Sequence, residues 1–192
     1  MKNWLEDLNK TLGLGLILAF IVFLIRGYYG ILGEMSFWAF LFRWIHVVLG
    51  ILWIGLLYYF NFVQIPSMPK ITDEQKPAIT KVIAPAALFY FRWAAAGTVL
   101  FGVLTGGTNG SIGHALVLQS PFVTIGIGMW LAIFMAANVW FIIWPNQRKV
   151  LGLVEADAEA KKKAGRLALL ASRTNTMLSI PMLFCMVGQK LL

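Results

Sequence analysis

Residues 122–144 read FVTIGIGMWLAIFMAANVWFIIW and contain no charged side chain. About 20 predominantly apolar residues in a helix are enough to cross the hydrocarbon core of a bilayer. The stretch is therefore predicted to be a membrane-spanning helix. The composition of the whole chain agrees, because 59% of its 192 residues are hydrophobic and 12% are charged. About a quarter of the residues in a typical soluble domain are charged, so the sequence predicts an integral membrane protein.

Four further apolar runs predict four further spans. We expect an all-α, polytopic transmembrane helix bundle in which the whole chain, residues 1–192, forms a single membrane domain. The five predicted spans cover residues 12–28, 38–62, 84–104, 122–144 and 167–187. Pro66, Pro69 and Pro77 lie between the second and third spans. Because proline interrupts the hydrogen-bond ladder of a helix, we expect any helix in that connection to be short.

The lysines and arginines between the predicted spans indicate the orientation in the membrane. Residues 63–83 contain three lysines and residues 145–166 contain six basic residues, whereas residues 106–120 contain neither Lys nor Arg. Short cytoplasmic loops are enriched in Lys and Arg. We therefore expect an N-in/C-out protein that crosses a bacterial cytoplasmic (inner) membrane several times. This topology accounts for the net charge of +8 without a nucleic-acid partner, and it makes membrane lipids the expected surroundings.

The predicted cytoplasmic segment 145–166 is too long for a tight turn. Asp157 precedes Lys161, and Glu159 precedes Lys163, by four residues each, a spacing at which acid–base pairs stabilise a helix. We expect a helical extension of the fourth or fifth span. It could be a solvated charged helix or a docking surface for a partner.

The second predicted span contains two ionisable residues, Arg43 and His46, three positions apart and hence on one helix face. An ionisable side chain in hydrocarbon costs at least a few kcal/mol and often marks a functional site. His46 could be hydrogen-bonded between helices, or it could ligate haem iron or another metal. A second axial histidine could come only from His114 in the outer loop. Five-coordinate haem, or a methionine such as Met129 or Met135, is the alternative.

Haem b is the expected cofactor if His46 binds haem, and covalent attachment of the c type is excluded. The chain contains one cysteine, Cys185, and this excludes the Cys-x-x-Cys-His attachment motif of c-type haem. Trp53 lies deep in the second span, in line with His46, and could flank a flat ligand. Arg43 could bind an anionic group such as a haem propionate.

Four polar residues in the third, fourth and fifth spans are predicted to meet nearer the cytoplasmic side. They are Arg92, Asn138, Arg173 and Asn175. The predicted spans contain neither Asp nor Glu, so the arginines have no carboxylate partner within the bilayer. They could reach lipid phosphates, or together with the asparagines they could form an inner pocket for an organic anion. The lack of acids argues against a proton-coupled carrier.

Three stretches of the chain carry a family resemblance. Residues 43–55, RWIHVVLGILWIG, residues 138–149, NVWFIIWPNQRK, and residues 172–186 follow the pattern of three membrane segments. Together they resemble the N-terminal domain family of membrane-integral urate oxidase (urate hydroxylase). Full-length members carry a C-terminal c-type cytochrome, and we expect this chain to be a short form without it.

The resemblance implies a role in membrane electron transfer or oxidation, with haem as the expected cofactor and a separate redox partner. The family has histidines where this chain has Thr174 and Lys190, and an acidic residue where it has Ala94. These departures leave open whether the chain is itself an enzyme. The alternative is a non-catalytic accessory subunit that packs beside a larger membrane enzyme.

Overall fold

Every regular element in the described part of the chain is a helix. The computed structural model describes residues 4–189, and no strand occurs among them. The all-α prediction is confirmed. The chain divides into two compact units, Met1–Trp38 and Ala39–Leu192, which are described separately.

The first unit consists mainly of α1 (Leu8–Ile25), flanked by the short 3-10 helices η1 (Trp4–Glu6) and η2 (Tyr28–Ile31). Asp7 caps α1 by accepting hydrogen bonds from the backbone N–H groups of Asn9 and Lys10. The helix ends before Gly27, whose φ of 71° is a left-handed conformation. After its first turn the helix is apolar on all sides. Such a surface is typical of a helix surrounded by lipid.

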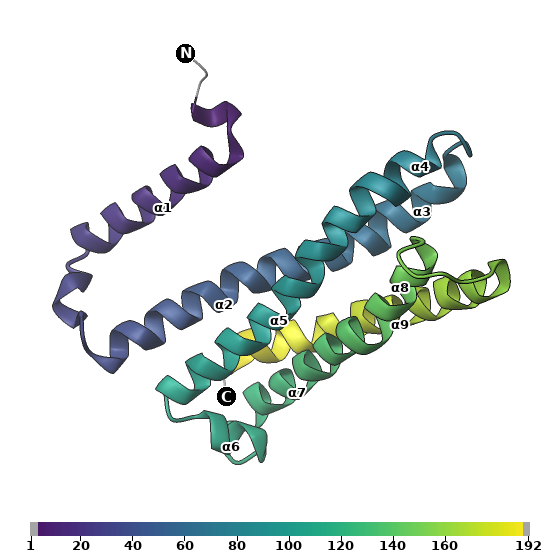
Figure 1. Cartoon of the computed structure of the whole chain (residues 1–192). Coiled ribbons are helices and arrows are strands. Elements are labelled where there is room, and N and C mark those ends of the chain that lie inside the picture. Colours follow the sequence, from purple (N-terminus) through teal and green to yellow (C-terminus); the bar gives the residue numbers. More distant parts are fainter. Residues whose placement is uncertain (1–3, 190–192) are drawn as a thin grey trace. The chain divides into compact units, whose positions relative to one another are not determined.

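The second unit is built from long helical segments, each made of several consecutive elements (Figure 1). The first contains α2 (Met35–Tyr58), which begins in the first unit, then η3 (Tyr59–Gln64), α3 (Ile65–Ser67) and η4 (Met68–Lys70). The next contains α4 (Lys76–Ala78), η5 (Ile79–Ile83) and α5 (Ala84–Thr108). After the short α6 (Ile112–Leu116) come α7 (Val123–Asn138), η6 (Val139–Ile143) and α8 (Trp144–Val150), and finally α9 (Ala158–Gly188).

Four helical segments among residues 4–189 are long and apolar enough to cross a membrane. They are Leu8–Ile25, Met35–Lys70, Lys76–Thr108 and Val123–Val150. The helix α9 is not among them, because its first turns are charged and the polar residues 172–176 lower the hydropathy of the rest. It nevertheless runs beside α7 and α8 (Figure 1). The Gln189 side chain after its end bonds to Pro121 and Ile125 at the start of the α7 segment.

A π-helical turn precedes a proline in each of the three long segments of the second unit. The turns are η3, η5 and η6, and the prolines Pro66, Pro85 and Pro145 follow them as the second residue. Proline has no N–H, and its ring clashes with the carbonyl four residues earlier. In each case the residue just before the proline donates its N–H to a carbonyl five residues back, for example Ile65 to Phe60. The helix therefore continues past Pro66 to Lys70, instead of ending where the sequence predicted.

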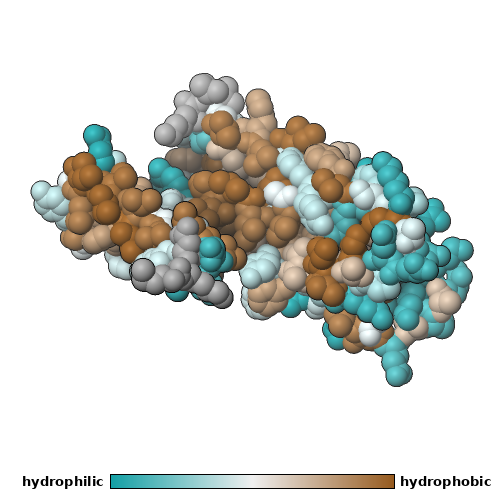
Figure 2. Space-filling model, turned by 90° about the horizontal axis from the view of Figure 1, so that it is seen from above, coloured by the Kyte–Doolittle hydropathy of each residue, from teal (hydrophilic) through white to brown (hydrophobic). Residues whose placement is uncertain are grey.

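The core of the second unit lies between α2, α5, α7 and α9. Its most deeply buried side chains include Trp53, Leu57, Phe91 and Met135. The loops 71–75 and 151–157 lie at one end of these helices, here called the basic end because the lysines and arginines of residues 70–81 and 148–166 gather there. Figure 2 shows hydrophilic residues concentrated at this end, on the right of the view.

Candidate functional site

His46 is fixed between α2 and α5 by a hydrogen bond to the main chain. Its Nδ1 lies 2.7 Å from the carbonyl oxygen of Thr98, and the ring is half-buried. A carbonyl can only accept, so Nδ1 carries the proton and donates it. In the neutral ring the lone pair is then on Nε2. A metal-ligating histidine has the same arrangement, with one nitrogen donating to an acceptor and the other free to bind.

Gly102 makes room for the imidazole of His46. A Cβ atom at this position would lie 3.0 Å from His46 Cε1 and 3.1 Å from Nδ1. Nearby, Gly97 admits the Leu49 side chain, and Gly50 lies next to the Thr98 methyl group. These small residues leave room for side chains at the contact between α2 and α5. The position of His46 thus depends on a glycine and on a backbone oxygen.

Three other residues were predicted to form a site with His46, namely Arg43, Trp53 and His114. The structure does not bring all of them close to the imidazole. Arg43 is exposed on α2, one turn from His46, and no hydrogen bond or ion pair to it occurs within residues 4–189. Trp53 is completely buried in the core, and its indole Nε1 has no hydrogen-bond partner there. His114 is exposed on α6, where Nδ1 lies 2.7 Å from Gln119 Oε1 and the ring stacks on Phe122.

No hydrogen bond or ring contact joins His114 to His46 in the described part of the chain. Nor does that part contain a group of three or more His, Cys, Asp or Glu side chains suited to a metal ion. A metal at His46 would therefore take one protein ligand from this cluster. That donor set fits haem iron, whose other four ligands are supplied by the macrocycle.

Two of the four residues predicted for the inner pocket form a buried amide pair. Asn138 Nδ2 donates to Asn175 Oδ1 at 2.8 Å and to the Ala171 carbonyl at 3.0 Å. Asn175 Nδ2 donates to the Met135 carbonyl at 3.0 Å. Asn175 is fully buried and Asn138 nearly so. The pair joins α7 to α9 across the core.

The two arginines predicted for the same pocket lie elsewhere. The guanidinium carbon of Arg92 is 3.8 Å from the centre of the Trp144 ring and 5.5 Å from that of Phe89. Arg173 is exposed on α9. The amide pair is therefore a link between helices, and the arginines do not share a pocket with it.

Comparison with known proteins identifies the C-terminal part of the chain. Residues 111–191 match the urate oxidase N-terminal family. The predicted resemblance is confirmed over this range, which contains the Asn138–Asn175 pair and the helix turn at Pro145. No curated protein and no solved structure matches the chain.

A second polar cluster links the helix α2–η3 to α9, which lies in the part of the chain that matches the urate oxidase N-terminal family. Asn61 Nδ2 donates to Ser172 Oγ at 2.8 Å and to the Leu57 carbonyl at 2.9 Å. The Tyr58 hydroxyl lies 2.9 Å from Ser179 Oγ. Sequence reasoning missed this cluster, although an asparagine inside an apolar run, as at Asn61, was a signal. Asn61 Oδ1 and Gln64 Oε1 are buried without a partner in the described residues.

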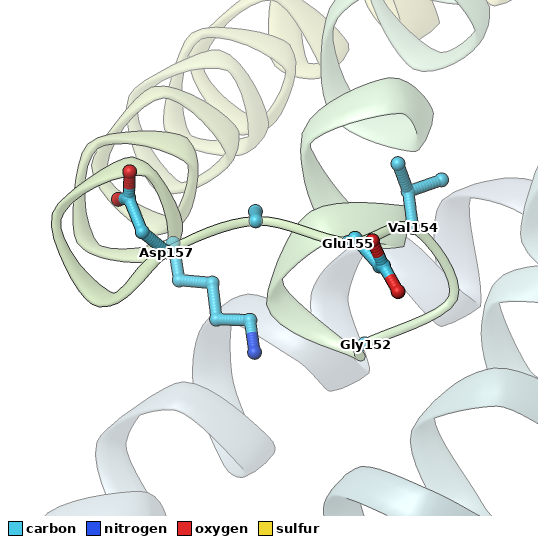
Figure 3. Close-up of a pocket in the computed structure, with 6 residues that line it drawn as sticks. Gly152, Val154, Glu155 and Asp157 are labelled. Carbon is cyan, nitrogen blue, oxygen red and sulfur yellow. The ribbon is translucent and has the colours of Figure 1, made fainter.

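A surface pocket lies at the basic end of the helices, in the connection between α8 and α9 (Figure 3). Its lining includes Glu155, Asp157 and Lys161. Asp157 Oδ1 accepts the backbone N–H of Ala160 at 2.7 Å and so caps α9. The carboxylate is thereby used to begin the helix, and the pocket contains none of the predicted site residues.

Proposed function

We propose that this protein acts in membrane electron transfer or oxidation, with haem b bound through His46 and electrons exchanged with a separate redox partner. The observation that supports the proposal best is the hydrogen bond from His46 Nδ1 to the Thr98 carbonyl at 2.7 Å. It fixes the tautomer whose Nε2 can bind iron. The family match over residues 111–191 and the apolar helices are compatible with a membrane protein resembling urate hydroxylase.

In this proposal each residue near the site has a distinct task. His46 would hold the iron through Nε2, and the Thr98 carbonyl orients the ring and increases its basicity as a ligand. Gly102 leaves space for the imidazole. Arg43, one turn away on the same helix, would bind a haem propionate. Bound haem would supply one-electron redox chemistry, which no side chain of this cluster provides.

The orientation of the helices supports a redox partner on the outer side. His46 lies beside Gly102, towards the end of α5 that is farther from the basic end. By the positive-inside rule the basic end faces the cytoplasm. His46 then lies in the outer half of a bacterial cytoplasmic membrane, where a partner outside the membrane can exchange electrons with it.

A pyridine haemochrome assay on protein purified in mild detergent tests the proposal. We expect haem b in the wild type and its loss in His46→Ala. Gly102→Ala should lower the haem content, because the added methyl group would displace the imidazole from Thr98. Gly107→Ala is the matched control, since it lies on the same helix with no atom within 4 Å of the added Cβ. Absence of haem from the wild type, or unchanged haem in His46→Ala, would refute the proposal.

A second candidate function is that of a non-catalytic accessory subunit in a larger membrane complex. The observation that favours it is that His46 does not line the pocket at Gly152–Lys161 or the groove between α5 and α7. This candidate predicts that haem-free protein co-purifies in mild detergent with a stoichiometric partner. Monodisperse, haem-containing protein would contradict it.

A further inference from the structure

A shallow apolar groove runs between α5 and the α7–η6 segment. Its volume is about 320 Å³, and its lining consists of Ala96, Val99, Ile133, Ala136, Ala137, Trp140 and Phe141. The alanines provide the space, and Trp140 forms a wall. Trp140 is held in place by a hydrogen bond from Nε1 to the Arg92 carbonyl at 3.1 Å, and by an edge-to-face contact with Trp93 at 5.2 Å.

Two arginines lie at the end of this groove nearer the basic end. Arg92 precedes Ala96 by one turn, and its guanidinium extends to the ring of Trp144. Arg148 follows Trp144 by one turn of α8 and is exposed, so both arginines lie near the Trp144 ring. Neither arginine forms an ion pair with a carboxylate within residues 4–189, where the salt bridge present joins Lys76 to Asp73.

We propose that the groove and these two arginines form a binding site for an anionic phospholipid. One acyl chain would lie in the groove against Ala96 and Ala137, and the lipid phosphate would lie between Arg92 and Arg148. Guanidinium groups bind phosphate oxygens through paired, charge-assisted hydrogen bonds. Tryptophans such as Trp144 are common at the depth of the lipid headgroups.

Charge and size select this occupant over others. No acidic side chain pairs with either arginine in the described residues, so a choline or ethanolamine cation would find no partner and a net negative headgroup is preferred. The groove is about 12 Å long on the α7–η6 side, from Ile133 to Phe141, but its α5 side consists only of Ala96 and Val99, about one turn. A partner helix would need a longer groove for several of its side chains, whereas a single acyl chain fits a short one.

Native mass spectrometry of the purified protein tests the site. The protein is equilibrated in detergent with equal amounts of phosphatidylglycerol and phosphatidylcholine that have the same acyl chains. We expect preferential retention of phosphatidylglycerol. Arg148→Gln should lower that retention about fivefold, the effect of one basic residue near a lipid headgroup, and Arg92→Gln should act in the same direction. Arg173→Gln, an exposed arginine on α9, is the matched control and should retain the lipid.

A second set of variants tests the groove while both arginines stay in place. Ala137→Leu should reduce phosphatidylglycerol retention by filling the groove. Ala86→Leu, at an exposed position of α5 outside the groove, should not. Millimolar inorganic phosphate should compete poorly, because it has no acyl chain.

Several outcomes would overturn the assignment. The protein could retain the two lipids equally, or Arg148→Gln and Arg173→Gln could lose phosphatidylglycerol to the same extent. Full displacement of the lipid by inorganic phosphate would also contradict the site. A dimer or a bound protein that is lost in Ala137→Leu would assign the groove to a protein partner instead. Because Arg148 is exposed, its substitution leaves the core intact, and the test does not depend on a variant that fails to fold.

Discussion

At the scale of single residues, the chain places polar groups in its core and satisfies most of them between helices. Asn138 and Asn175 illustrate how much a sequence can predict. Both stand out as amides in apolar runs, so their importance could be inferred, and their common depth could be estimated from helix geometry. Helix geometry also separates Asn175 from Arg173, which is two positions away on the same helix and so on another face. The separation of the amide pair from Arg92 could not be predicted, because it depends on how different helices pack.

His46 shows the same limit more sharply. The sequence marks it as an ionisable residue in the membrane, but its partner is the carbonyl oxygen of Thr98. Every residue has such an oxygen, so no sequence pattern could single it out. The role of Gly102 is also invisible in the sequence, since the chain contains 18 glycines and only the structure shows which one faces the imidazole.

The Asn138–Asn175 pair is expected to stabilise the contact between α7 and α9. Asn175→Ala removes the acceptor of Asn138 Nδ2 and the donor to the Met135 carbonyl. Hydrogen bonds between membrane helices are worth about 1–2 kcal/mol in model peptides, and we expect a loss of that size. Unfolding in mixed micelles with increasing dodecyl sulfate, followed by circular dichroism, measures it.

The control for this variant is the adjacent residue on α9. The Thr174 hydroxyl bonds to the Leu170 carbonyl of its own helix, so Thr174→Ala should leave the α7–α9 contact unchanged. The double variant Asn138→Ala/Asn175→Ala should be less destabilised than the sum of the single variants. Strict additivity would show that the two amides do not act as a pair.

At the scale of elements, glycines determine how closely the helices approach. Small residues favour close helix packing in membranes in general, and the structure identifies particular contacts. The position of a Cβ on Gly126 falls on the backbone carbonyl of Ala115 in α6, and that of Gly128 lies 2.9 Å from Cys185 Cβ in α9. The helix α7 thus contacts two different elements through two glycines within one turn.

Gly126→Ala is expected to separate α6 from α7. The obstacle is a backbone oxygen rather than the end of a flexible side chain, so the helices themselves must move. Overpacking of this kind typically costs about 1–3 kcal/mol, and thermal unfolding in detergent should show a loss in that range. Gly113→Ala on α6, where no atom lies within 4 Å of the added Cβ, should leave the midpoint unchanged or raise it. Equal midpoints for the two variants would contradict the contact.

At the scale of the whole molecule, the all-α architecture follows from hydropathy, but the lengths of the helices do not. The segment Met35–Lys70 extends beyond the predicted span 38–62 because its π turn lets the helix continue through Pro66. Hydropathy also ranks α9 below the other long helices, although it packs along α7 and α8. Three of its polar residues, Ser172, Asn175 and Ser179, are buried against neighbouring helices, and a composition average cannot detect that.

Cysteine labelling tests the orientation and the crossing of α9. In a Cys185→Ser background, Lys162→Cys should react with a membrane-impermeant maleimide only in inverted vesicles. Asn109→Cys and Gln189→Cys should react in intact spheroplasts, because both lie at the end opposite the basic end. Their labelling on the same side as Lys162→Cys would contradict an N-in/C-out protein with a fifth crossing.

The π turns before Pro66, Pro85 and Pro145 also affect how the chain should be compared with its relatives. A π turn contains one residue more than the α-helical turn it replaces. A homologue without the proline and with an uninterrupted helix would therefore align with a one-residue gap at residues 59–64, 79–83 or 139–143. An alignment that forbids gaps inside helices would shift every later residue of that helix by one position. Asn138 and Arg148 lie on either side of such a turn, so evolutionary conservation has to be assessed separately before and after it.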